Sequence, residues 1–159
     1  MSKYNKGIEN LRNKHYEEAA NDLCKFISKD KLTTETNNIK EEHEKRDKLH
    51  LSNTELKELC KNAIDYFENK IKNSQDNLDT NNFCAGIIHT IGNNVDNEYF
   101  DKVFKLSNDI TLLGKLGVIY EKYQKSDKAI ECFEKILQIE PNNKEALNSI
   151  QTINNHRKK

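Results

Sequence analysis

Histidine is the side chain best suited to acid–base or metal chemistry near neutral pH, and three histidines of this chain invite that interpretation. His43 and His50 are seven residues apart, so on a helix they would lie about 10 Å apart, too far to share a metal ion without further ligands. His89 lies in an apolar stretch with little acid or base nearby; we favour a structural or groove-facing histidine over a general base. The sequence has no phosphate-binding loop, nucleophile elbow or zinc-protease motif. We therefore expect no catalytic site, metal or cofactor.

The four cysteines are spread along the chain and form no C-x-x-C pair. Each falls within an apolar helical pattern, where a free thiol packs as a small hydrophobic side chain. We expect free thiols in a reducing compartment, with a disulfide pair or a metal site as the alternatives that spacing leaves open. The residues are Cys24, Cys60, Cys84 and Cys132.

The composition predicts a thin core and a large solvated surface. Of 159 residues, 35% are hydrophobic and 33% are charged, a ratio that suits an elongated helical array better than a sphere. The 26 Lys and Arg residues balance 26 Asp and Glu residues, which argues against general nucleic-acid binding. No apolar run reaches the length of about 20 residues that spans a membrane, and the first residues lack the apolar region of a secretion signal. We expect one cytoplasmic domain without a membrane partner.

The last third of the chain shows the clearest elements. From residue 110 onward, apolar residues recur at spacings of three and four, as on a helix with one buried face. Ser126 follows a break in this pattern and is expected to cap a second helix. Pro141 ends that helix, and Asn142 or Asn143 is expected to cap a third. The pattern predicts a hairpin of two antiparallel helices and one further helix.

The spacing within this hairpin resembles the tetratricopeptide repeat, a family of stacked helical hairpins. The physical reason is that Gly117 and Ala129 are small enough for two helices to approach closely, while Tyr120 and Phe133 fill the surrounding space. Gln124 departs from the pattern because a turn glycine is common there. The signature residues are Leu113, Leu116, Gly117, Tyr120, Ala129, Phe133 and Pro141.

Two earlier stretches repeat parts of the pattern. Near the N-terminus, Gly7 and Ala19 stand at the signature glycine and alanine positions. Further along, Ala63 and Phe67 stand at the signature alanine and phenylalanine positions, about two repeats of 34 residues before the C-terminal copy. Residues 37–51 are almost wholly polar, and we favour a weakly anchored helix there over a flexible insertion.

Together these patterns predict an all-α superhelix, or solenoid, of about four tetratricopeptide-like hairpins and a C-terminal capping helix. We expect a single domain over residues 1–159. The expected hairpins span 3–30, 36–74, 80–107 and 109–140, and the capping helix spans 143–155.

The resemblance implies a non-catalytic interaction module whose concave groove, lined by the first helix of each hairpin, holds a partner's peptide or helix. The groove residues in this register are polar to weakly basic, so an acidic peptide is one ligand hypothesis, and ordinary solvated side chains are the alternative. The expected groove residues are Asn5, Ile8, Arg12, Asn82, His89, Lys115, Val118 and Lys122.

One subfamily binds chaperone C-termini through a clamp of Lys, Asn and Arg side chains. Asn5 and Lys115 fit two of its positions, but Met1 and Thr111 stand where the clamp requires Lys, so we do not expect it here. The remaining alternatives are a self-associating scaffold that forms a homo-oligomer, a helical-repeat enzyme centred on His89, and, against the charge balance, an RNA binder.

Overall fold

The computed structural model describes residues 2–28, 51–92 and 94–157. His43, His50, Met1 and the first part of the expected hairpin at 36–74 lie outside these ranges. Within them the chain forms α-helices joined by short connections. The helices are α1 (Lys3–Arg12), α2 (Tyr16–Ile27), α4 (Asn53–Asn73), α5 (Leu78–Gly92), α6 (Glu98–Leu106), α7 (Ile110–Lys122), α8 (Ser126–Ile139) and α9 (Lys144–Arg157).

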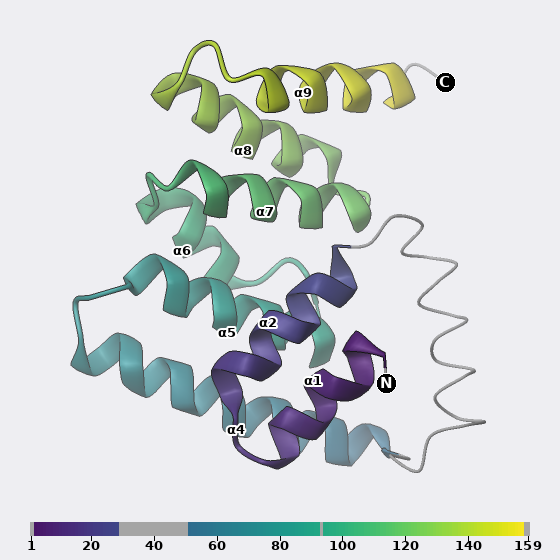
Figure 1. Ribbon diagram of the computed structural model, residues 1–159, viewed down its shortest axis with the longest axis vertical. Helices are drawn as coiled ribbons and strands as arrows, with labels where there is room; N and C mark the ends of the chain where they lie inside the picture. Colours follow the sequence, from purple (N-terminus) through teal and green to yellow (C-terminus); the bar gives the residue numbers. More distant parts are fainter. Residues whose placement is uncertain (1, 29–50, 93, 158–159) are drawn as a thin grey trace.

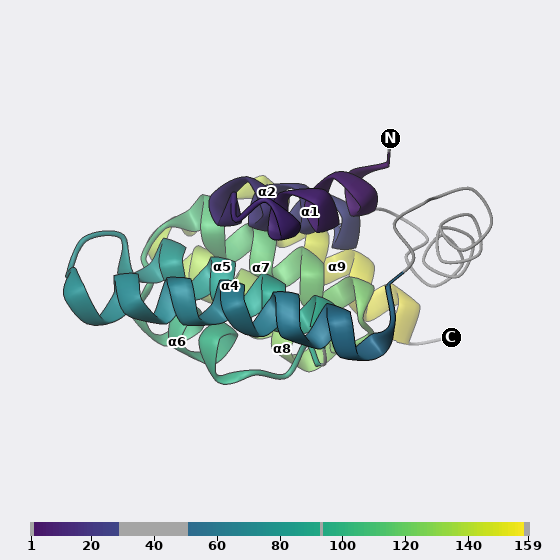
Figure 2. The same cartoon turned by 90° about the horizontal axis from the view of Figure 1, so that it is seen from below.

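Helices α4 to α9 follow one another along the long axis of the molecule (Figure 1). Each packs against the next, from α4 against α5 through α8 against α9. The hairpin of α1 and α2 lies across one face of this row, with α1 on α4 and α2 on α5. Figure 2 shows this hairpin on the side opposite α6 and α8. The predicted all-α fold of sequential helical hairpins is confirmed.

A glycine in the first helix of a hairpin lies against a large side chain in the second. A Cβ atom built on Gly117 would lie 2.7 Å from the ring of Phe133, closer than real Cβ contacts allow. The sequence predicted Ala129 as the neighbour of Gly117, but the closest atoms across the hairpin belong to Phe133, and Ala129 is buried beside them. The same contact pairs Gly7 with Leu23 and Gly86 with Phe100.

The signature residues expected to pack the hairpins are buried, with the exception of Pro141, which follows the end of α8.

Two of the predicted caps have different outcomes. Asn143 caps α9, since its Oδ1 accepts a hydrogen bond from the backbone N–H of Ala146 at 2.9 Å. Ser126 does not cap α8: it is the first helical residue, and the N-cap residue Lys125 makes no side-chain cap bond.

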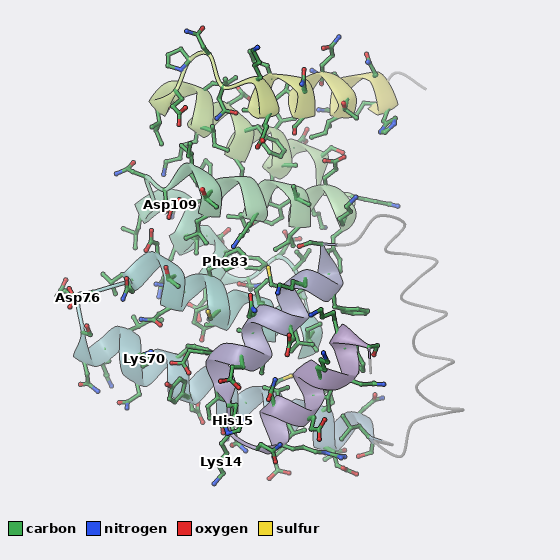
Figure 3. All side chains as sticks on the ribbon, viewed as in Figure 1. Lys14, His15, Lys70, Asp76, Phe83 and Asp109 are labelled. Atoms are coloured by element: carbon green, nitrogen blue, oxygen red, sulfur yellow. The ribbon has the colours of Figure 1, made fainter. Side chains whose placement is uncertain are left out.

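Polar contacts hold the N-terminal hairpin on α4. Glu17 at the start of α2 accepts hydrogen bonds from the Tyr66 hydroxyl at 2.6 Å and from Lys70 Nζ at 2.8 Å. Lys70 lies beside the first turn of α2, not far from the α1–α2 turn formed by Lys14 and His15 (Figure 3). These bonds join residues about 50 positions apart in the sequence and link the start of α2 to α4.

Candidate partner-binding groove

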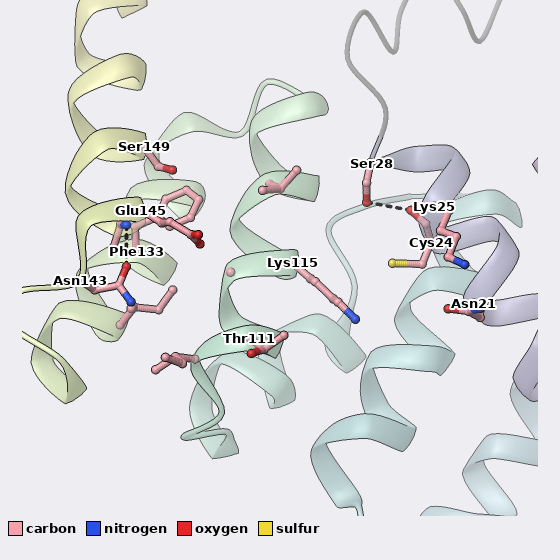
Figure 4. Close-up of a pocket in the computed structure, with 15 residues that line it drawn as sticks. Asn21, Cys24, Lys25, Ser28, Thr111, Lys115, Phe133, Asn143, Glu145 and Ser149 are labelled. Atoms are coloured by element: carbon pink, nitrogen blue, oxygen red, sulfur yellow. Dashed lines mark hydrogen bonds between the residues drawn. The ribbon is translucent and has the colours of Figure 1, made fainter.

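An open groove of about 530 Å³ runs over α7, between α2 on one side and α9 on the other (Figure 4). Its floor is formed by one face of α7, including Gly114 and Val118, with Phe133 and Ile136 of α8 beneath. Asn21 and Cys24 belong to the α2 wall, while Glu145, Ala146 and Ser149 form the α9 wall. The lining therefore combines α7, the first helix of its hairpin, with the second helices α2 and α8 and with α9.

Local hydrogen bonds mark the start of α7 and the end of α2, two of the helices that line the groove. Asp109 Oδ1 accepts a hydrogen bond from Thr111 N–H at 2.9 Å, which starts α7. At the end of α2, the Ser28 hydroxyl donates to the Cys24 carbonyl at 2.7 Å. These bonds satisfy backbone groups that would otherwise be unpaired at the two helix ends.

The groove has an open floor because Gly114 has no side chain. A Cβ atom built there would meet only Ile136 Cδ1, at an ordinary contact distance of 3.9 Å. When α5 is aligned with α7 through Gly86 and Gly117, Phe83 occupies the equivalent position. Phe83 is only 6% exposed, and its ring centroid lies 5.8 Å from that of Phe100. The repeat at α7 therefore lacks the aromatic side chain that fills the same space at α5.

The α2 side of the groove is basic. The exposed side chains of Lys25 and Lys115 both line it, and Lys115 extends from α7 toward α2 (Figure 4). Burial raises the pKa of the Cys24 thiol, and the hydrogen bond with Ser28 and the charges of Lys115 and Lys25 oppose this shift. Across the groove, Glu145 of α9 supplies a negative charge. The α2 wall and the α9 wall thus carry charges of opposite sign.

Of the groove residues predicted from the sequence, the structure places Lys115 and Val118 in this groove. Ile8 is fully buried and Asn82 is 1% exposed, so these two side chains pack in the core and are not available to a ligand. Arg12 is exposed on α1, and its Nη2 atom lies 3.9 Å from Oε2 of Glu55 in α4. The remaining predicted groove residues, Asn5, His89 and Lys122, do not line this groove either.

His89 lines a separate, smaller cavity of about 410 Å³ between α4 and α5, together with Lys57, Lys61 and Cys60. Its buried Nδ1 atom has no hydrogen-bond partner among the described residues, and its ring lies 6.1 Å from that of Tyr99. Burial raises the pKa of the Cys60 thiol to about 12, so this thiol stays protonated and weakly nucleophilic.

The cysteines and acidic residues of the described ranges form no group of three or more with histidine that could hold a metal ion. The four cysteines are free thiols. Burial raises the pKa of Cys84 to about 11 and that of Cys132 to about 12, as expected for thiols that pack as apolar side chains. In the described part of the chain, every helix is too short or too polar to cross a membrane.

Sequence reasoning missed the α2 wall of the groove. Cys24 and Lys25 lie in a second helix, and in the repeat register second helices do not face the concave side. Gly114 was also missed, although a glycine three residues before the signature Gly117 was a visible signal of open space on α7.

Comparison with known families gives one match. Residues 111–143 match the family described as tetratricopeptide repeat, a stretch that begins with α7 and ends at the cap of α9. No curated protein and no solved structure matches the chain. The matched residues include the floor of the groove and the α8 residues beneath it.

Proposed function

Because residues 111–143 form a tetratricopeptide repeat, a unit that generally mediates protein–protein interactions, we propose that this chain is a non-catalytic module that binds a partner protein in the groove over α7. The observation that carries the proposal is the open floor at Gly114, on the matched repeat itself. Lys25 and Lys115 favour a partner segment with an acidic residue. The four free thiols suit the reducing cytoplasm.

The mechanism is rigid presentation. The groove is built from helices whose packing residues, such as Leu116 and Phe133, are buried, so its shape exists before binding. A flexible partner segment therefore bears most of the ordering cost, and less of the contact energy is lost to reorganisation of this chain. Such a module brings a partner to a fixed surface and performs no bond chemistry on it.

The test compares two substitutions at one position. Gly114→Phe should fill the groove with the side chain that α5 already carries at its equivalent position, while Gly114→Ala should leave most of the space open. Both variants and the parent chain would be used as bait in the native lysate, and captured proteins would be identified by mass spectrometry. We expect a set of proteins held by the parent and by Gly114→Ala but lost with Gly114→Phe.

Two outcomes would contradict the proposal. If every captured protein is held equally by Gly114→Phe, the groove is not the binding surface. If sedimentation at micromolar concentration shows a tight oligomer of the parent that Gly114→Phe dissociates, the groove serves self-association instead. Circular dichroism of all three chains would establish that the variants are folded.

A further inference from the structure

Cys24 of α2 and Cys84 of α5 differ from the other two cysteines in their exposure. Both side chains are partly exposed, whereas Cys60 is 3% exposed and Cys132 is fully buried. Cys24 also lines the open groove, so a small molecule in the solvent can reach its thiol. Because α2 packs on α5, with Cα atoms of the two helices less than 8 Å apart, the directions in which the two side chains point decide whether the thiols meet.

The contacts of Glu17 show which face of α2 carries Cys24. The two residues are seven positions apart, almost two full turns, so their side chains lie on one face of the helix. On that face Glu17 binds Tyr66 and Lys70 of α4. Cys24 lies about 10 Å further along, in the part of α2 that runs from α4 across α5 toward α7 (Figure 1). Cys24 therefore faces the row of helices where α2 crosses α5.

The neighbours of two glycines show which way Cys84 points from α5. Gly86, two positions later, faces Phe100 of α6, and two positions turn a helix by about 200°. Gly92 faces Cys60 of α4, and its direction differs from that of Cys84 by about 80°. Cys84 thus points away from α6 and to one side of α4. The first hairpin lies on the side of the row opposite α6 (Figure 2), so this side of α5 is the one that α2 covers.

The surroundings of the two thiols give them different roles in an oxidation. Burial raises the pKa of Cys24, but the hydrogen bond with Ser28 and the charges of Lys115 and Lys25 oppose this shift and favour the reactive thiolate. Burial raises the pKa of Cys84 to about 11, and the charge of an ionised Cys24 acts in the same direction. Cys24 is therefore the thiol that reacts first with an oxidant, and Cys84 reacts second.

We infer that Cys24 and Cys84 form a redox-sensitive pair, which hydrogen peroxide converts into a disulfide that ties the first hairpin to α5. The sulfur of Cys24 attacks one oxygen of the peroxide, the O–O bond breaks, and the products are a sulfenic acid and one water. The sulfur of Cys84 then attacks the sulfur of Cys24, and the sulfenic hydroxyl leaves with the thiol proton of Cys84 as a second water. Two thiols are oxidised and one peroxide is reduced. Disulfides of this transient, redox-sensing kind occur in cytosolic proteins.

The experiment treats the full chain with hydrogen peroxide, blocks the remaining thiols with N-ethylmaleimide and digests the product with trypsin without reduction. Mass spectrometry should show residues 15–25 linked to residues 73–102, with a mass two hydrogen atoms below the sum of the two peptides. Dithiothreitol should remove the link. Cys24→Ser and Cys84→Ser should each abolish it. The matched control, Cys60→Ser with Cys132→Ser, should form the link to the same extent as the parent.

Thermal unfolding tests whether the bond fits the docked hairpin. A disulfide requires Cα atoms about 4.4–6.8 Å apart, and a bond formed without distortion stabilises the fold because it restricts the unfolded chain. The loop that it closes holds about 60 residues, so the Tm of the oxidised parent should rise by about 5–15 °C. The same treatment should leave the Tm of Cys84→Ser unchanged.

Three outcomes would overturn the inference. Sulfinic acid on Cys24 without the link would mean that Cys84 is out of reach. Links that involve Cys60 or Cys132, or that join two chains, in place of the expected link would mean that the fold does not select this pair. A link that forms without a rise in Tm would mean that the bond distorts the packing of α2 on α5. The measurements on the parent chain need no substituted protein, so they remain decisive if a serine variant fails to fold.

Discussion

Asn97 Oδ1 accepts a hydrogen bond from the backbone N–H of Phe100 at 3.0 Å and thereby starts α6. The amide group of the same side chain lies within 3.1 Å of the Asn94 carbonyl and 3.4 Å of the Gly86 carbonyl in α5. One buried side chain thus caps one helix and ties it to the preceding turn and helix. We predict that Asn97→Ala lowers the free energy of unfolding by about 1–2 kcal/mol, because it removes the cap and leaves buried groups unsatisfied.

Urea denaturation followed by circular dichroism measures this loss. The matched control is Asn94→Ala, which removes an exposed side chain that accepts one bond from Asp96 N–H at 3.0 Å. The control should cost less than about 0.5 kcal/mol, as is usual for exposed sites. Equal losses in the two variants would show that the buried position of Asn97 is energetically unimportant.

Gly114 and Gly117 lie one turn apart on α7 and should respond oppositely to the same substitution. Gly117→Ala forces a methyl group against the ring of Phe133, and we predict a loss of about 1–3 kcal/mol from overpacking. Gly114→Ala meets no close atom and should raise stability by up to about 1 kcal/mol, through the better helix propensity of alanine. Thermal unfolding of both variants provides the comparison. A stabilising effect of Gly117→Ala would contradict the close packing of α7 on α8.

Gln124 stands where the repeat usually has glycine, and its backbone has a φ angle of 62°. Side chains other than glycine are disfavoured in this left-handed region by about 1–2 kcal/mol. We predict that Gln124→Gly raises the free energy of unfolding by up to about 1 kcal/mol, part of the gain being offset by the greater entropy of glycine in the unfolded chain. Gln124→Ala is the control. It removes the side-chain amide but keeps the Cβ atom, so we expect no increase in the free energy of unfolding. If both variants raised the free energy of unfolding, the cause would be removal of the glutamine side chain and not relief of backbone strain.

The sequence pattern was most informative where helices of one hairpin meet. The signature residues around Gly117, from Leu113 to Pro141, predicted the C-terminal hairpin. Where two helices approach closely, only side chains of certain sizes fit, and these positions recur at fixed distances along the sequence. The equivalent contact of Gly86 with Phe100 was not recognised. There the two residues are 14 positions apart, against 16 for Gly117 and Phe133, since the connection between α5 and α6 differs in length.

The position of the first hairpin could not be predicted from the repeat. Residues within a hairpin are close in sequence, whereas Glu17 meets Tyr66 and Lys70 across about 50 residues, through side chains that also suit a solvated helix surface. Nothing in their spacing marks them as partners. Because the α2 wall of the groove depends on this docking, the sequence predicted the α7 residues Lys115 and Val118 but not Lys25 of α2.

Asp96, in the turn before α6, joins that turn to the start of α8. Its carboxylate lies 2.7 Å from Lys128 Nζ and 3.0 Å from Lys125 Nζ. The hydrogen bonds from Lys128 and then Lys125 lower the pKa of Asp96 below its ordinary value, and burial opposes this shift only in part. A carboxylate with a lower pKa in the folded chain stabilises the fold at every pH above the ordinary value of about 4. This contribution is lost as the pH falls from about 4 through the folded-state pKa.

We predict that Asp96→Asn lowers the free energy of unfolding at pH 7 by less than about 1 kcal/mol, since the side chain is 35% exposed and the ion pairs are screened by solvent. The difference from the parent should shrink below pH 4 and should also be smaller in 1 M salt. Urea unfolding at pH 7 and pH 3 measures both effects. In the background of Lys128→Gln, the effect of Asp96→Asn at pH 7 should be reduced, because one of the two cations is already absent. A difference that is the same at pH 3 and pH 7 would mean that the negative charge of Asp96 does not contribute to the packing of α8.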